Sequence, residues 1–111
     1  MKIMTGKVID VAGWDVAAVI AEQRGLILFD LWSPTCAPCR ALAPILDDLA
    51  ADFVDELRIC KVNVAVDEAI AKPFAARTLP TLALYRDGVE IDRVVGLKSR
   101  GHLTAWLESH L

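Results

Sequence analysis

The sequence predicts an α/β domain with a mixed sheet, and three observations carry that prediction. Apolar segments of strand length alternate with helical segments, as in parallel strands joined by crossover helices. The dipeptide Asp87-Gly88 separates the last two strand-like segments and is typical of a tight antiparallel hairpin. Hydrophobic residues make up 55% of the 111 residues, which is enough for one core. We therefore expect a single domain over residues 1–111.

The first crossover is expected to begin with a short strand at 8–9. A helix then runs over 14–23, with Trp14 and three alanines as its apolar residues and Gly25 placed to end it. Trp14 is expected to pack in the core. This strand and helix form the amino-terminal part of the alternating pattern.

The next two elements carry the strongest patterns. Leu26–Trp32 is a continuous apolar stretch interrupted only by Asp30, which favours a central strand covered on both faces. The helix expected at 36–53 repeats apolar residues every three or four positions along one side. Pro44 lies inside this helix and is expected to kink it.

The second half of the chain continues the alternation. A strand is expected at 57–64, a short helix at 67–76, and hairpin strands at 81–85 and 89–95. Ser99 is placed to cap a last helix. Its apolar residues are Leu103, Trp106, Leu107 and Leu111.

Charge and hydropathy exclude some functions. The net charge is −3 with no run of basic residues, so we expect no binding of nucleic acid. No apolar stretch approaches the roughly 20 residues that a membrane span requires. Residues 1–7 lack an apolar signal core, so we expect a cytoplasmic protein that does not bind membranes, with a monomer as the default state.

The chemistry is expected at Cys36-Ala37-Pro38-Cys39, which follows the central strand and opens a helix. Helix-terminal amides and the helix dipole favour the thiolate of the first cysteine, so Cys36 is expected to be the nucleophile. Cys39 lies one turn deeper and is expected to be the buried resolving thiol. Pro38 fits the first helical turn, where a missing amide costs little.

The alternative for this pair is half of a zinc site. Zinc takes about four ligands, and the remaining candidates are Cys60, His102 and His110, none of which forms a second close pair. A motif of this spacing beside a strand–helix crossover favours redox chemistry, so no metal is expected. We expect Cys60 to pack in the core and the two histidines to face solvent.

Asp30 is unusual because a carboxylate within a buried strand is expensive. It either escapes to water at an edge or is a buried acid of raised pKa that exchanges a proton with Cys39. Lys61, on the neighbouring strand, is its candidate partner, or else an ordinary exposed lysine. Pro80 precedes a strand, and its spacing alone does not argue for a cis peptide.

Taken together, these residues resemble the thioredoxin family over nearly the whole chain, from about Val8 to Leu111. The segment W-S-P-T-C-A-P-C-R, from Trp32 to Arg40, is similar to the family's W-x-x-W-C-G-P-C-K. The other matching positions are Asp30, Pro44, Lys61, Thr78-Leu79-Pro80-Thr81 and Val95-Gly96.

The resemblance implies a five-stranded mixed sheet in the order 1-3-2-4-5 flanked by four helices. It also implies a protein-disulfide reductase without a cofactor, in which Cys36 attacks a substrate disulfide and Cys39 resolves the mixed disulfide. A reductase akin to thioredoxin reductase then recycles the pair. The implied catalytic residues are Cys36, Cys39, Asp30 and Lys61, and the implied substrate-binding residues are Trp32, Thr35, Ala37, Pro38, Leu79, Pro80 and Gly96. The resemblance further implies that Pro80 is cis and lies beside the cysteine pair.

Two departures from the family bear on this reading. Thr35 stands where the family has a tryptophan, and its hydroxyl can cap the active-site helix. Ala37 replaces a glycine and places a methyl group where partners approach. The alternatives kept open are a disulfide isomerase or oxidase, or a binding module dedicated to one partner.

Overall fold

The computed structural model describes residues 6–111, and its elements follow the expected order. They are β1 (Ile9–Asp10), η1 (Gly13–Asp15), α1 (Val16–Glu22), β2 (Leu26–Trp32), α2 (Ala37–Asp52), β3 (Leu57–Asn63), α3 (Glu68–Ala71), η2 (Lys72–Phe74), β4 (Thr81–Arg86), β5 (Val89–Val95) and α4 (Arg100–Glu108). Ser99 caps α4 as predicted, accepting a hydrogen bond from the amide of His102.

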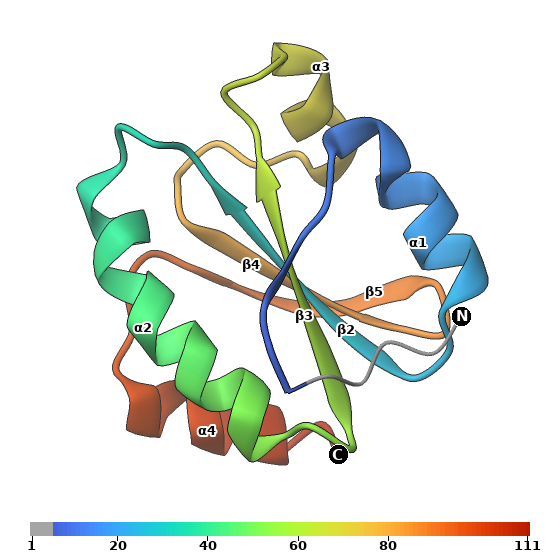
Figure 1. The fold of residues 1–111 in the computed structure, drawn as a ribbon, viewed down its shortest axis with the longest axis vertical. Helices are drawn as coiled ribbons and strands as arrows, with labels where there is room; N and C mark the ends of the chain where they lie inside the picture. Colours follow the sequence, from blue (N-terminus) through green and yellow to red (C-terminus); the bar gives the residue numbers. More distant parts are fainter. Residues whose placement is uncertain (1–5) are drawn as a thin grey trace.

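The five strands form one mixed sheet in the order β1-β3-β2-β4-β5. β1, β3 and β2 are mutually parallel, whereas β4 runs antiparallel to β2 and β5 antiparallel to β4. Figure 1 shows α2 and α4 on one side of the sheet and α1 and α3 on the other. The predicted strand order and the layered fold are confirmed.

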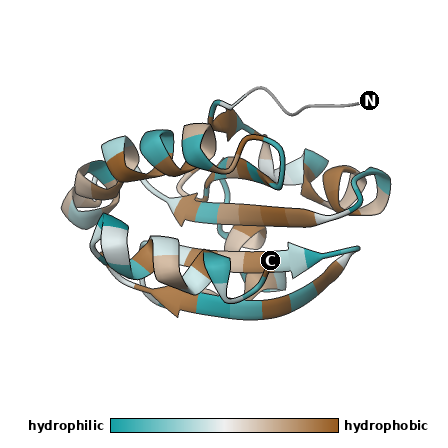
Figure 2. Ribbon diagram, turned by 90° about the horizontal axis from the view of Figure 1, so that it is seen from below, coloured by the Kyte–Doolittle hydropathy of each residue, from teal (hydrophilic) through white to brown (hydrophobic). Residues whose placement is uncertain are grey.

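Alternation along β2 divides the interior into two cores. Leu26 and Leu28 pack with the buried leucines of α2 and α4, whereas Phe29 and Leu31 pack with residues of α1 and η2. Both sets are needed because a strand covered on both faces buries every side chain. Figure 2 shows the resulting layers, with hydrophobic residues concentrated along the inner strands.

The sheet has two different edges. At one edge β1 is only two residues long. At the other, β5 follows a turn in which Asp87 and Gly88 both have positive φ, as in a tight hairpin. The pairing of β5 with β4 shifts register between Leu84 and Tyr85.

Three expectations about side-chain placement are wrong. Trp14 is 75% exposed, since it lies in η1 before α1 begins, and Val16 of α1 is buried instead. Leu111 lies beyond the end of α4 and is exposed. His110 does not simply face solvent, since its Nε2 lies 2.8 Å from a carboxylate oxygen of Asp92.

No helix among residues 6–111 is long and apolar enough to cross a membrane.

Candidate active site

The candidate site lies at one end of the sheet, where β2 and β5 end and β4 begins. β2 ends at Trp32, β4 begins at Thr81 opposite Leu31, and β5 ends at Val95 opposite Thr81. The connections after β2, before β4 and after β5 therefore meet at the same end of the sheet (Figure 1). Because loops at the end of a sheet are held by rigid strands, they can fix reactive groups in space.

Cys36 and Cys39 form a disulfide at the start of α2, with their Cα atoms 5.2 Å apart. Cys36 is the N-cap residue, and its sulfur accepts a hydrogen bond from the amide of Cys39 at 3.2 Å. Cys36 is partly exposed, whereas Cys39 is only 3% exposed. A sulfur at the positive end of a 16-residue helix is well placed to carry charge as a thiolate.

Asp30 is buried on the α2 side of the sheet. It is 1% exposed and follows Leu28 by two residues, so it lies on the same face of β2, the one that packs against α2. Cys39 lies on the same buried helical stripe as Leu42, so it faces the side of the sheet on which Asp30 is buried. Neither carboxyl oxygen of Asp30 has a hydrogen-bond partner among the described residues.

The environment of Asp30 raises its pKa from 3.8 to about 7. Loss of hydration on burial is the largest cause, and the positive charge of Lys61 partly opposes it. At neutral pH this carboxyl group is therefore present in both protonation states, as a group that exchanges protons requires. Of the two alternatives for Asp30, the structure shows a buried acid and not one that reaches water at an edge.

Lys61 is opposite Asp30 in the parallel pairing of β3 with β2, but it makes no close ion pair with that carboxylate. Its Nζ instead lies 4.3 Å from the centre of the Trp32 ring, which is a cation–π contact. Lys61 is partly buried rather than an ordinary exposed lysine. Asp30, Trp32 and Lys61 thus share one side of the sheet, below the start of α2.

Pro80 lies at the same end of the sheet, immediately before β4. The Leu79–Pro80 peptide is cis, as the resemblance implied. The carbonyl of Pro80 accepts a hydrogen bond of 2.8 Å from the amide of Gly96, which joins the connections before β4 and after β5. Gly96 has φ of +89°, a conformation that glycine adopts readily. A contact of Pro80 with the cysteine pair stays a prediction.

The expectation that Thr35 caps α2 is wrong, because the cap is the Cys36 sulfur. The hydroxyl of Thr35 instead lies 3.5 Å from that of Ser33. Sequence reasoning also missed a contact of Arg40, whose guanidinium donates to the carbonyl of Pro34 at 2.8 Å. A long side chain one turn into a helix can reach back to the preceding loop. The position of Arg40 six residues after Pro34 could therefore have predicted this contact.

The remaining candidates differ in exposure. Ala37 and Pro38 are exposed on the first turn of α2, and Leu79 is partly exposed before β4. Cys60, in contrast, is buried on the other side of the sheet, with Phe29 and Val62. Within residues 6–111, no group of three or more His, Cys, Asp or Glu side chains is arranged to hold a metal ion.

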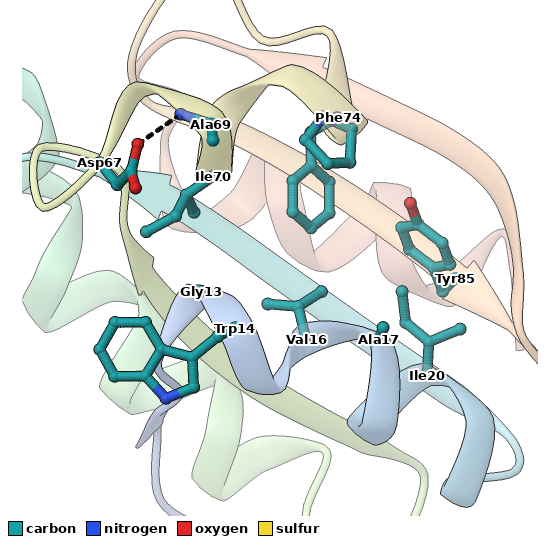
Figure 3. Close-up of a pocket in the computed structure, with 11 residues that line it drawn as sticks. Gly13, Trp14, Val16, Ala17, Ile20, Asp67, Ala69, Ile70, Phe74 and Tyr85 are labelled. Carbon is teal, nitrogen blue, oxygen red and sulfur yellow. Dashed lines mark hydrogen bonds between the residues drawn. The ribbon is translucent and has the colours of Figure 1, made fainter.

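A separate cavity of about 330 Å³ opens between α1 and α3 (Figure 3). Its lining is mainly apolar, with Val16, Ile70 and Phe74 inside and Tyr85 at one end. None of the candidate catalytic residues lines it. The reactive disulfide therefore stands at a surface and not in this cavity.

Comparison with known proteins gives consistent matches. The family model described as thioredoxin matches residues 7–109. Thioredoxin 1 of Synechococcus elongatus is 36% identical over 92 residues, covering 83% of this chain and 86% of that protein. The chloroplastic thioredoxin M-type of Triticum aestivum is 32% identical over 104 residues, covering 94% of this chain and 58% of the relative.

Among solved structures, a mutant thioredoxin from Halobacterium salinarum NRC-1 superposes with a TM-score of 0.86. The two are 27% identical, and the match covers 98% of this chain and 95% of the other. The agreement extends over the whole sheet and its helices.

Proposed function

The chain belongs to the thioredoxin family of thiol–disulfide oxidoreductases, and we propose that it reduces protein disulfides through a mixed disulfide at Cys36. The observation that carries the proposal is the position of Cys36 as the partly exposed cap of α2, with Cys39 buried one turn behind it. Thioredoxins need no cofactor, because the redox-active disulfide is part of the protein.

The reaction begins with the dithiol form. The thiolate of Cys36 attacks one sulfur of the substrate disulfide, forms a new S–S bond to it and releases the other substrate sulfur as a thiolate. Cys39 then loses its proton and attacks the Cys36 sulfur, closing the Cys36–Cys39 disulfide and releasing the second substrate thiolate. Two electrons pass from the protein to the substrate, whose two thiolates take up protons.

Asp30 is the group proposed to accept the proton of Cys39. Its pKa of about 7 leaves a large fraction of carboxylate at neutral pH, and its burial on the side of the sheet that α2 covers supports this role. Lys61 is proposed to stabilise that carboxylate, since its charge lowers the pKa of Asp30. The first attack does not involve this proton, so Asp30 acts in the second step.

The substrate surface is proposed to consist of groups around the disulfide that differ in exposure. Thr35, Ala37 and Pro38 are exposed, Trp32, Leu79 and Gly96 are partly exposed, and Pro80 is buried. Trp32 forms the base of this surface, while Thr35, Ala37 and Pro38 form the side contributed by the start of α2. Leu79, Pro80 and Gly96 form the opposite side. An extended substrate segment can pair with the backbone at Leu79, as in strand addition.

A reducing compartment is the proposed setting, with an electron-donating reductase that returns the disulfide to the dithiol. The residues between the cysteines, Ala37 and Pro38, carry no titratable group that stabilises the Cys36 thiolate, which favours a reducing potential. We place the protein in the cytoplasm as a monomer. Equilibration with glutathione tests this: a potential more than about 60 mV above that of thioredoxin indicates an isomerase or oxidase.

Trapping of the intermediate tests the proposed nucleophile. Reduced Cys39→Ser protein mixed with oxidised insulin is expected to accumulate an adduct on Cys36, because the resolving thiol is absent. Peptide mapping by mass spectrometry locates the adduct, with Cys60→Ala as a matched variant that retains turnover. An adduct located on Cys60 contradicts the assignment.

A second experiment tests Asp30. Asp30→Asn is expected to slow resolution of the mixed disulfide at least about tenfold at pH 7 and to leave the first attack nearly unchanged. Stopped-flow measurement from pH 6 to pH 8 separates the two steps. Equal resolution rates in both proteins over this range remove Asp30 from the mechanism.

A further inference from the structure

The surface around the disulfide has one sign of charge. The three segments that meet there, residues 33–40, 75–80 and 95–99, contain Arg40, Arg77 and Lys98 and no carboxylate. The chain as a whole is net −3, so this positive surface contrasts with the rest of the molecule. The position of this surface follows from the sheet, because β2, β4 and β5 bring these segments to one end of it (Figure 1).

These cations are not neutralised within the described part of the chain. None of the three forms an ion pair with a carboxylate among residues 6–111. The neighbouring Arg100, in contrast, is held by Asp48 and Asp52 of α2. Arg40 donates only to a backbone carbonyl, which leaves its positive charge uncompensated.

Negative charge at the same end of the sheet lies on the side that α3 covers. Asp67 and Glu68 begin α3 after β3, on the side of the sheet away from α2. Asp67 is already engaged, since its carboxylate accepts from the amide of Ala69 at 2.9 Å. Arg77 borders this side, since it lines a pocket together with Glu68 and Lys72. The segments that carry Arg40 and Lys98, in contrast, contain no carboxylate.

Exposed apolar groups lie among the cations. Val95 is 44% exposed and Leu97 is 46% exposed, next to the Gly96 amide that binds Pro80. A surface with an apolar centre and uncompensated positive charges around it suits a polypeptide segment with acidic residues near an apolar one.

We propose that Arg77 and Lys98, with Arg40, select protein disulfides whose reacting cysteine is flanked by acidic residues. This inference rests on the proposed reductase function and names its substrate class. The cations attract acidic segments during encounter, so the preference resides in kcat/KM and weakens with salt.

Matched peptides test the inference. Three peptides share one disulfide ring and differ in flanks of glutamate, glutamine or lysine, and each is reduced by the dithiol protein. At an ionic strength of about 0.02 M, we expect kcat/KM for the acidic peptide to exceed that for the basic one about tenfold or more. At about 0.5 M the ratio is expected to approach one.

Charge reversal identifies the residues responsible. Arg77→Glu combined with Lys98→Glu is expected to reverse the order of the peptides, and Arg77→Gln combined with Lys98→Gln is expected to reduce the preference to the part that Arg40 supports. Arg24→Glu is the matched control, because Arg24 is exposed and precedes the opposite end of β2. The wild-type salt dependence needs no variant, so a folding defect does not remove the test.

Equal kcat/KM for the three peptides at low ionic strength overturns the inference while leaving the reductase function intact. A preference that persists in the doubly reversed variant overturns the assignment to Arg77 and Lys98. If the dithiol protein reduces none of the peptides and no insulin, the proposed function fails, and the inference with it.

Discussion

The two sides of the sheet bury their side chains equally well but differ in chemistry at the carboxyl ends of the strands. On the side that α2 covers, the buried groups include Asp30 and Cys39, and Lys61 and Trp32 are partly buried. Below α1, the corresponding positions of β2 and β3 are apolar, and the cysteine there is Cys60.

The comparison shows that burial does not by itself make a thiol reactive. Cys60 and Cys39 are both buried, yet only Cys39 lies beside a thiol at a helix start. Desolvation raises the pKa of Cys60 to about 11, which leaves little thiolate at neutral pH. Reactivity requires donors and charge near the sulfur, and those are found on one side of the sheet.

The largest expected difference between the two sides is in alkylation. In the fully reduced protein at pH 7, iodoacetamide is expected to modify Cys36 at least about a hundredfold faster than Cys60, because the pKa of Cys60 is about 11. Mass spectrometry of timed samples measures both rates. Urea-unfolded protein is the control, in which Cys60 becomes an ordinary thiol. Comparable rates in the folded protein contradict the comparison.

The next effect concerns the cost of the buried acid. The folded pKa of Asp30 is raised, so its contribution to stability falls as pH rises from about 4 to about 7. Asp30→Asn is therefore expected to gain stability relative to wild type over that range, by about 4 kcal/mol at pH 8 and little at pH 4. Urea unfolding at both pH values measures the difference. A stability difference that does not change with pH excludes a raised pKa.

A pair of glycine substitutions compares the packing on the two sides. A Cβ on Gly13 would lie 2.4 Å from side-chain carbons of Ile70, next to the cavity of Figure 3, whereas one on Gly101 of α4 meets nothing within 4 Å. We expect Gly13→Ala to cost about 1–3 kcal/mol and Gly101→Ala to add about 0.5 kcal/mol. Thermal unfolding of both variants tests this. A stable Gly13→Ala protein indicates that Ile70 moves freely.

The smallest effect is expected where α4 meets β5. Hydrogen bonds from Trp106 and His110 hold the pKa of Asp92 below its usual range. Stability from these bonds is present above the ordinary carboxyl pKa and is lost as pH falls through the folded value. Asp92→Asn is therefore expected to reduce stability slightly at pH 7 and to equal wild type in strong acid. Acid unfolding curves that separate in acid rather than at neutral pH contradict this.

Most of the fold could be predicted because local signals agreed with one another. The apolar stretch of β2, the turn at Asp87-Gly88 and the cap at Ser99 each indicated one element, and the alternation indicated the crossovers. Trp14 was misplaced because an amphipathic pattern rich in alanine leaves the direction of its buried side ambiguous. Only the packing of Val16 against the sheet decides it.

The site was partly predictable for a similar reason. Cys36 and Cys39 follow from spacing, and a carboxylate within an apolar strand drew attention to Asp30. The cap by the Cys36 sulfur, in place of the Thr35 hydroxyl, depends on backbone dihedral angles that residue types do not specify. The contact of Lys61 with Trp32, likewise, needs the register of β2 against β3.

The edges of the sheet have a consequence for association between copies of the chain. An exposed edge strand offers unpaired backbone groups to which another strand can add. Here β1 is only two residues long, and β5 is irregularly paired and carries Glu90, Asp92 and Arg93. Short, bulged and charged edges are poor templates for edge-to-edge aggregation. The strand pairing proposed at Leu79 therefore does not require the protein to offer its sheet edges to other chains.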